Sequence, residues 1–203
     1  MCPRLIFATR NSHKLKELEL ILTSVWKEFP SDLLATMSDF GIADPVEDGV
    51  SFAENALLKA RAVCQETGIS AVADDSGLCV DILGGAPGIF SARWSGDHGN
   101  DRANLDLLLA QLSDVPPRHR QASFVCAAAV VFPSGEEYVE MGQLSGTLLS
   151  EPQGEGGFGY DPIFLPSGCD VTTAQMSPSE KNAMSHRGIA LRALAPRLLQ
   201  AFQ

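Results

Sequence analysis

Two adjacent carboxylates, Asp74 and Asp75, are the residues of this sequence whose types and position point most directly to chemistry. They stand where the apolar run 69–73 gives way to Ser76 and Gly77, so we expect them at the mouth of a strand. A buried carboxylate is costly unless it is paired, hydrogen-bonded or bound to a metal. Neighbouring side chains of a strand point to opposite faces, so the two acids need not share a role. The pair indicates a metal site, although a solvated turn would use the same residue types.

A polar loop at positions 9–14 is the second candidate site. It lies between an expected strand at 4–8 and an expected helix, whose N-terminal N–H groups favour a phosphate. The alternative is that Asn11 only caps the helix and Lys14 only faces water. The glycines of a Walker A loop are missing. The residues of the loop are Thr9, Arg10, Asn11, Ser12, His13 and Lys14.

A third candidate lies on a helix that a capping box at 51–54 announces and that Gly68 is expected to end. Asn55 and Lys59 are four residues apart on this helix and therefore share one face. Glu47 lies just upstream in an acidic loop. A solvated helix face would explain these residues equally well.

The segment 154–159 matches the GxGxxG pattern of dinucleotide-binding proteins, but its context does not fit that function. The dinucleotide motif follows a strand and opens a helix, whereas this segment runs into Asp161 and Pro162, which favour a turn into a strand. Glycines beside Phe158 and Tyr160 suit a backbone on which a flat base can stack. An aromatic core plug at a tight turn is the alternative.

The last candidates follow a second capping box at 177–180. Lys181 lies on the helix that this box starts, and Ser185, His186 and Arg187 follow it. Cations near a helix end are usually partners of the helix dipole, but Arg187 beside His186 can also donate to a carbonyl of a base.

The elements that must position these residues are strand–helix units in the first half and a hairpin in the middle. The hairpin is expected from strands at 124–132 and 138–148, with Pro133 and Gly135 at the turn, and a further helix is expected at 101–112. This order predicts an α/β fold with a mixed sheet and an active-site cleft between two lobes. With 203 residues and 45% apolar composition, the sequence predicts a single domain over 1–203.

Composition excludes several classes of function. A net charge of −10 argues against nucleic-acid binding, because a phosphate backbone needs a basic partner. The apolar runs are too short to span a membrane, and we expect a cytoplasmic protein with reduced cysteines, since its five cysteines form no CxxC pair. The chain has only five lysines, so an anionic ligand must find one of a few local basic patches.

Seven ordered blocks of this sequence closely resemble the inosine/xanthosine triphosphate pyrophosphatases, which remove nonstandard purine nucleotides. The blocks span nearly the whole chain. They are ATRNSHK at 8–14, FAENA with Lys59 and Ala60, ADDSGL at 73–78, GGAPG at 84–88, SAR at 91–93, GFGYDP at 157–162, and EKN at 180–182 with SHR at 185–187.

The resemblance implies hydrolysis of ITP, dITP or XTP to the monophosphate and pyrophosphate, with Mg²⁺, by a homodimer whose elongated mixed sheet is flanked by helices. It implies that Asp75 and Glu47 bind the metal, and that Asp75 activates the water that attacks the α-phosphorus, with Asp74 and Lys59 as further catalytic residues. The residues of the polar loop, including Lys14, would bind phosphates together with Ser76 and Lys181. The base would be held by Phe158, Gly159, Tyr160, Asp161, His186 and Arg187.

One residue departs from the family pattern, because related sequences usually have glycine where this chain has Arg10. If the position needs a positive φ, arginine would be strained there. Alternatively, Arg10 adds a cation to the phosphate loop. Two other functions remain open: a regulator that binds nucleotides without hydrolysing them, and an NAD(P)-dependent oxidoreductase, which requires a helix after Gly159.

Overall fold

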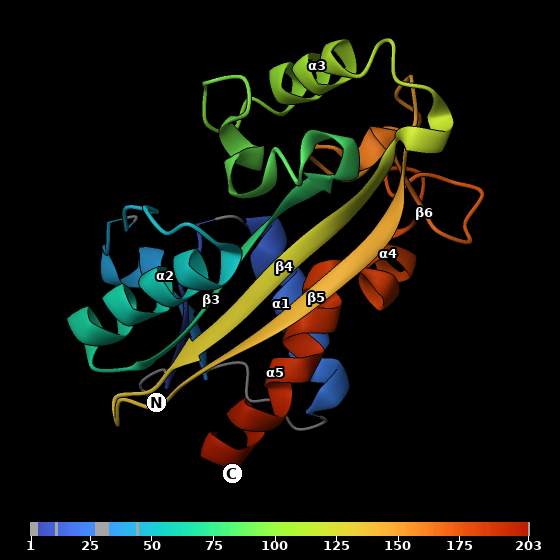
Figure 1. Cartoon of the computed structure of the whole chain (residues 1–203). Coiled ribbons are helices and arrows are strands. Elements are labelled where there is room, and N and C mark those ends of the chain that lie inside the picture. The colour runs from blue at the N-terminus through green and yellow to red at the C-terminus, as the bar shows by residue number, and fades with distance from the viewer. Residues whose placement is uncertain (1–3, 11, 27–32, 44, 203) are drawn as a thin grey trace. The chain divides into compact units, whose positions relative to one another are not determined.

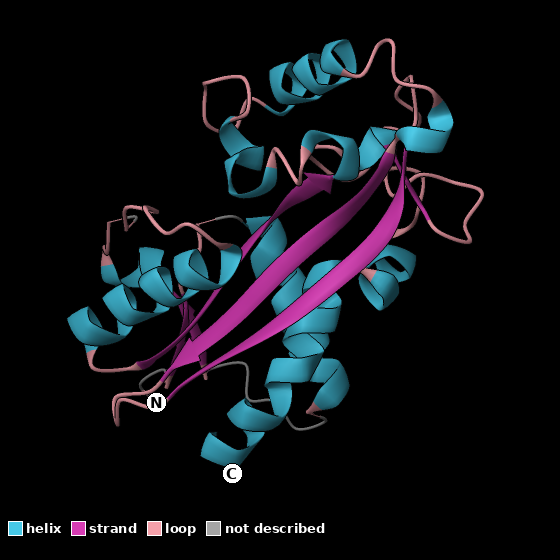
Figure 2. Cartoon of the chain, viewed as in Figure 1, coloured by secondary structure: helices cyan, strands magenta, loops and turns pink. Residues whose placement is uncertain are grey.

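The computed structural model describes residues 4–10, 12–26, 33–43 and 45–202 (Figures 1 and 2). Six strands form one sheet in the order β2-β1-β3-β4-β5-β6. β1 pairs in parallel with β2 and β3, whereas β5 and β6 pair in antiparallel fashion, so the predicted mixed α/β sheet is confirmed. The strands are β1 (Leu5–Phe7), β2 (Leu34–Thr36), β3 (Ser70–Val80), β4 (Gln121–Val131), β5 (Glu137–Leu148) and β6 (Phe164–Pro166).

Five α-helices accompany these strands in the described part of the chain. Short 3₁₀ helices complete the connections, among them Gly88–Arg93 and Asp161–Ile163. No helix of the described residues is both long and apolar enough to cross a membrane. The α-helices are α1 (Ser12–Val25), α2 (Phe52–Thr67), α3 (Asp101–Gln111), α4 (Pro178–Met184) and α5 (His186–Phe202).

The helix boundaries follow local capping chemistry. Ser51 caps α2 by accepting the N–H of Glu54 at 3.2 Å, and Gly68 ends the helix with a φ of 69°. The predicted capping box at this end is only half formed, because Glu54 accepts the N–H of Val50. The second predicted box, Ser177 with Glu180, is fully reciprocal at the start of α4.

The chain divides into two compact units. The first comprises residues 1–75, 126–142 and 187–203, and the second comprises residues 76–125 and 143–186. In the first unit the alternation of β-strand side chains separates two cores. One packs the odd residues of β1 and Val72 of β3 against α1 and α5. The other packs Ile6, Ala71 and Ala73 against α2, so each face of β3 meets its own helices.

The core of the second unit is smaller and richer in aromatic side chains. Leucines of α3 pack against Leu78 and Val80 at the end of β3, and Phe124 of β4 contacts Phe164 with ring centroids 4.5 Å apart. Tyr160 and Ile163 are buried in the same cluster. This core anchors the glycine-rich segment on its apolar side.

The structure corrects one prediction about β3. The two acids do not lie at the mouth of the strand, because β3 continues through Ser76 and Gly77 to Val80. Gly77 is needed here for close packing and not for a turn: a Cβ atom at this position would lie 2.3 Å from the carbonyl oxygen of Gly88. Asp74 and Asp75 are therefore buried residues in the middle of a strand.

Candidate active site

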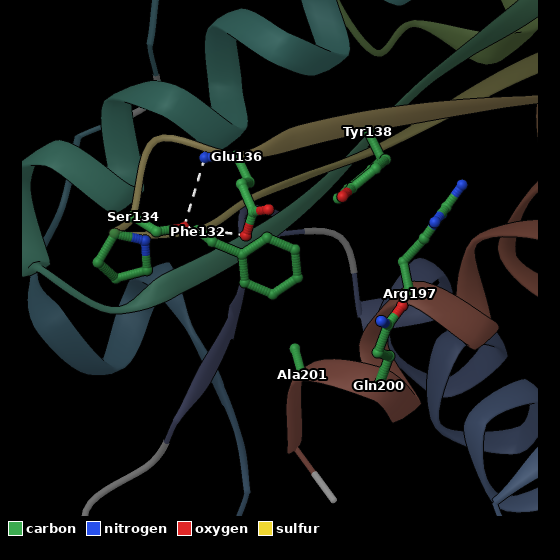
Figure 3. Close-up of a pocket in the computed structure, with 8 residues that line it drawn as sticks. Phe132, Ser134, Glu136, Tyr138, Arg197, Gln200 and Ala201 are labelled. Atoms are coloured by element: carbon green, nitrogen blue, oxygen red, sulfur yellow. Dashed lines mark hydrogen bonds between the residues drawn. The ribbon is translucent and has the colours of Figure 1, made fainter.

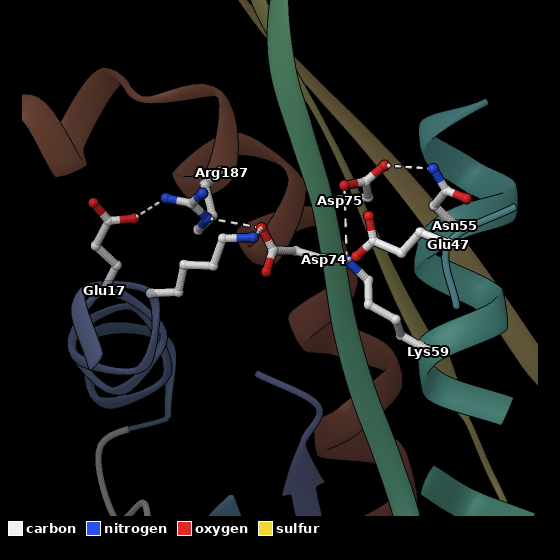
Figure 4. Close-up of polar contacts among 8 residues, drawn as sticks. Glu17, Glu47, Asn55, Lys59, Asp74, Asp75 and Arg187 are labelled. Carbon is white, nitrogen blue, oxygen red and sulfur yellow. Dashed lines mark hydrogen bonds and ion pairs between the residues drawn. The ribbon is translucent and has the colours of Figure 1, made fainter. Parts of the chain in front are cut away.

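Asp74 lies on the face of β3 that packs against α1 and α5 (Figure 4). Lys14 Nζ and Arg187 Nε each lie 3.0 Å from its Oδ2 atom, and Arg187 also binds Glu17 of α1. Burial alone would raise the pKa of Asp74, but the charges of Lys14 and Arg187 outweigh it and hold that pKa well below its usual range. Asp74 is thus a permanently charged residue inside a buried ion-pair network.

Asp75 points to the opposite face, toward α2 (Figure 4). Asn55 Nδ2 donates to Asp75 Oδ2 at 3.1 Å, and Lys59 Nζ lies 3.7 Å from Asp75 Oδ1. Lys59 also donates to Glu47 Oε1 at 2.8 Å. Burial raises the pKa of Asp75 more than Lys59 lowers it, and the nearby Glu47 adds to the rise. A carboxylate with a raised pKa is the better proton acceptor of the two.

Lys59 lies beside both Glu47 and Asp75 and is itself buried. Burial would lower its pKa, but the three carboxylates Asp75, Asp74 and Glu47 raise it overall, so Lys59 is held as a cation. Glu47 and Asp75 with Lys59 beside them form a charged cluster, and a lysine in such a cluster can bind an anionic group such as a phosphate.

Glu47 and Asp75 are the two residues that fit a divalent cation. Within the described ranges, no group of three or more His, Cys, Asp or Glu side chains could enclose a metal ion. Mg²⁺ does not require such a cage, because it is usually bound by one or two carboxylates together with substrate phosphates and water. Glu47 and Asp75 fit that pattern, and the donor set does not fit a closed structural metal site.

Asn55 is a member of this site that sequence reasoning noted on the helix face but did not include among the functional residues. Its side chain is fully buried, its Nδ2 donates to Asp75, and its Oδ1 accepts the N–H of Gly49 at 2.9 Å. Asn55 therefore connects the acidic loop of Glu47 to the strand that carries Asp75. Its spacing of four residues from Lys59 was the signal that could have identified it.

The first polar loop is described only in part. Asn11 lies outside the described residues, as do the side chains of Ser12 and His13. Thr9 is half-buried, and Arg10 donates from Nη2 to the carbonyl oxygen of Ile42 at 2.7 Å. No non-glycine residue in the described ranges has a positive φ, so Arg10 is accommodated without the strain that a glycine position would cause.

The aromatic segment belongs to the second unit and is organised by Asp161. This buried carboxylate accepts the N–H of Phe158 at 2.8 Å and the hydroxyl of Thr173 at 2.8 Å, and it pairs with Lys181 at 2.6 Å. Lys181 Nζ lies 4.8 Å from the centroid of the Phe158 ring. Lys181 therefore lies with the aromatic residue, whereas Lys14 and Lys59 form separate ion pairs in the first unit.

Three other predicted residues of this unit have defined surroundings. Tyr160 is buried and its hydroxyl donates to the carbonyl oxygen of Ser91 at 2.9 Å. His186 is buried and stacks on Phe124 with ring centroids 5.0 Å apart. Ser76 is half-buried in β3. The segment after Gly159 forms a short 3₁₀ helix and then β6, so the α-helix that a dinucleotide fold requires is absent from these described residues.

A pocket of about 440 Å³ lies elsewhere in the first unit, at the turn between β4 and β5 and beside the end of α5 (Figure 3). Arg197 lies over the ring of Tyr138 there, 4.5 Å from its centroid. The pocket contains none of the residues predicted to bind nucleotide or metal. Its lining consists of Phe132, Pro133, Ser134, Glu136, Tyr138, Arg197, Gln200 and Ala201.

The mixed sheet, the buried carboxylate–lysine cluster and the glycine-aromatic segment define an α/β protein whose buried charged groups suit an anionic ligand. The family is shown by sequence: the chain matches the Ham1 family model over residues 5–197 and belongs to the Ham1 family. The resemblance seen in the seven blocks is thereby confirmed.

Close relatives and solved structures agree with this assignment. The chain is 58% identical over 193 residues to the dITP/XTP pyrophosphatase of Streptomyces coelicolor, covering 95% of this chain and 96% of that protein. It is 60% identical to the protein of the same name in Streptomyces avermitilis, with the same coverage.

Two solved structures have the same fold. The nucleoside-triphosphatase / dITP/XTP pyrophosphatase of Mycobacterium abscessus matches with a TM-score of 0.77 and 50% identity over 96% of this chain and 98% of that one. A HAM1 protein of Coxiella burnetii matches with a TM-score of 0.87 and 36% identity over 98% and 100%. The predicted fold class is confirmed by these neighbours.

Proposed function

We propose that this protein hydrolyses the nonstandard purine nucleoside triphosphates dITP, ITP and XTP to the monophosphate and pyrophosphate. The observation that carries the proposal is the pair Asp74 and Asp75, one fixed as a buried anion and the other poised as a proton acceptor beside Lys59 and Glu47. Relatives with the name dITP/XTP pyrophosphatase support the choice of substrate.

In this proposal Asp75 accepts a proton from the water that attacks the α-phosphorus. Its position in a buried strand favours that role, and Asn55 holds one carboxylate oxygen so that the other faces Lys59. A divalent cation held by Glu47 and Asp75, which we propose is Mg²⁺, would supply a Lewis acid for the phosphate oxygens and lower the pKa of bound water.

The lysines of the first unit supply positive charge for the triphosphate. Lys59 is held as a cation by its carboxylate neighbours and is positioned to stabilise charge that develops on the phosphates. Lys14 pairs with Asp74, and Thr9, Arg10 and Ser76 complete the proposed phosphate-binding set together with residues 11–13. Arg187 binds Asp74 and Glu17 and so also supports Asp74, while its expected contact with the base stays a proposal.

The aromatic segment of the second unit is proposed to recognise the base. Phe158 provides the stacking surface. Lys181, which we still propose as a phosphate-binding residue, pairs with Asp161 and lies over one side of that ring. Hypoxanthine and xanthine carry an acceptor at the six-position where adenine carries a donor, so hydrogen-bond donors there reject adenine. His186 and Gly159 belong to this proposed set, and Tyr160 supports it from the core.

We further propose a cytoplasmic homodimer with no nucleic-acid partner. The net charge of −10 disfavours binding to a phosphate backbone, and a nucleotide-pool enzyme works where its substrates are.

The test is to incubate the protein with Mg²⁺ and each of ITP, dITP, XTP, GTP and ATP, and to identify the products by ³¹P NMR. We expect pyrophosphate from the first three and little turnover of GTP and ATP. Equal turnover of all five, release of orthophosphate, or binding of ITP without hydrolysis would contradict the proposal. The last result would favour a regulator that binds nucleotides.

A further inference from the structure

Asp101, the first residue of α3, makes a contact that capping of the helix does not require. Its Oδ2 atom accepts the N–H of Gly159 at 2.8 Å, across 58 residues of sequence. The cap of α3 is supplied by Asn100, whose side chain accepts the N–H of Ala103. The carboxylate of Asp101 is thus available to hold the glycine-aromatic segment.

A second hydrogen bond to a carboxylate lies on the other side of Phe158. The N–H of Phe158 itself donates to Asp161 Oδ2 at 2.8 Å. The N–H of Phe158 belongs to the peptide unit before its Cα atom, and the N–H of Gly159 belongs to the unit after it. Two carboxylates therefore fix both peptide units that set the direction of the Phe158 side chain.

The segment needs such restraints because glycines surround the aromatic residue. Gly157 and Gly159 have φ angles of 73° and 61°, a region that glycine enters freely, and chain segments rich in glycine have many accessible conformations. A Cβ atom at Gly157 would lie 2.1 Å from Asp161 Oδ2, so this glycine cannot be replaced by a stiffer residue. Rigidity must come from hydrogen bonds, and those to carboxylates are the strong ones.

We propose that Asp101 is a positioning residue for base recognition, which holds Phe158 in the orientation that stacks on a purine. The inference rests on the proposed function for its choice of ligand. Asp101 does not touch the nucleotide; it acts through the peptide unit of Gly159. Removal of its carboxylate is expected to weaken binding of the base and leave the chemistry of the phosphates unchanged.

The first test compares steady-state kinetics of Asp101→Ala, Asp101→Asn and Asp106→Ala with ITP. Asp106→Ala is the matched control, because it removes the same charge from the exposed face of α3, where Asp106 pairs with Arg102. We expect KM to rise about fivefold in Asp101→Ala, the loss of one net hydrogen bond, with kcat within about twofold. Asp101→Asn keeps an acceptor oxygen and should restore most of the loss.

A double-mutant cycle with Phe158→Ala separates positioning from a general structural effect. In the Phe158→Ala background, Asp101→Ala should raise KM no further, because the ring that it orients is gone. An equal rise of KM in both backgrounds would overturn the proposal, as would a fall of kcat with KM unchanged or a rise of KM in the Asp106→Ala control.

Hydrogen exchange measures the contact without any nucleotide. In Asp101→Ala the amides of residues 157–160 should exchange at least several times faster than in the wild type and in Asp106→Ala. Unchanged protection would overturn the proposal even if ITP is hydrolysed. If none of the nucleotides is hydrolysed, the proposed function fails, and hydrogen exchange still decides whether Asp101 orders the segment.

Discussion

Asp74 and Asp75 are chemically identical neighbours that the strand places in opposite electrostatic environments. Asp74 forms ion pairs with Lys14 and Arg187. Asp75 accepts a hydrogen bond from Asn55 and lies near Lys59, which also pairs with Glu47. Favourable charge pairing lowers the pKa of the first, and burial with a like charge nearby raises the pKa of the second. The division of roles between them follows from the side of β3 on which each lies.

Replacement of Asp75 by asparagine should separate activity from stability. Turnover of ITP is expected to fall by about 10²–10⁴-fold, because the proton acceptor is lost. The free energy of unfolding should stay the same or rise, because a buried carboxylate near Glu47 is replaced by a neutral side chain that still accepts from Asn55. Kinetics and urea unfolding measure the two effects, and near-normal turnover would contradict the role of Asp75.

Replacement of Asp74 by asparagine should have the opposite effect on stability. It leaves Lys14 and Arg187 without their buried partner and is expected to cost about 3–5 kcal/mol. The pKa of Asp74 is lower in the folded protein than its value of about 4 in the unfolded chain. Ionised Asp74 therefore stabilises the fold above about pH 4, and this stability is lost as the pH falls below that value. The wild type should therefore lose stability over this acidic range more steeply than Asp74→Asn, as urea unfolding from pH 3 to pH 7 would show. Parallel pH profiles would contradict the assignment.

At the scale of elements, α2 supplies the residues that organise Asp75. Its cap at Ser51 and its end at Gly68 fix the helix, and four residues of spacing bring Asn55 and Lys59 to the same side. The buried side of α2 is thus partly apolar and partly polar. The helix sets the distance between the acidic loop of Glu47 and the strand of Asp75.

Asn55→Ala tests this role of α2. The change removes the hydrogen bonds of Asn55 to the N–H of Gly49 and to a carboxylate oxygen of Asp75, which should cost about 1–3 kcal/mol and also lower kcat. Arg61→Ala is the matched control on the same helix, because it removes an exposed ion pair with Glu137 worth less than about 1 kcal/mol. Thermal unfolding and kinetics of both variants provide the comparison, and equal kcat in Asn55→Ala and the wild type would refute the role.

Across the whole molecule, local sequence patterns predicted most of the helices and strands. Where a prediction was wrong, a contact between residues far apart in the sequence determined the structure. The caps at Ser51 and Ser177 and the helix beginning at Asp101 could be read from neighbouring residues. The continuation of β3 through Gly77 could not, because that glycine is required by Gly88, which lies eleven positions further along the chain. Ser76 and Gly77 are residue types that favour turns, but Gly77 is present because the backbone at Gly88 leaves no room for a side chain.

The candidate site shows the same limit. The types of the catalytic candidates and the two faces of a strand were predictable from sequence, but partners 113 and 58 positions away were not. The ion pairs of Arg187 with Asp74 and Glu17 were not predicted, and Asp101 gave no sequence signal beyond its place at the start of a helix. Such contacts depend on the fold as a whole, so only the structure supplies them.

We propose that water attacks the α-phosphorus of a nonstandard purine triphosphate, and hydrolysis of ITP in water enriched with ¹⁸O tests this proposal. Mass spectrometry of the products shows which fragment receives the oxygen of the water. We expect one ¹⁸O atom in inosine monophosphate and none in pyrophosphate. Label in the pyrophosphate, or release of orthophosphate in its place, would contradict it.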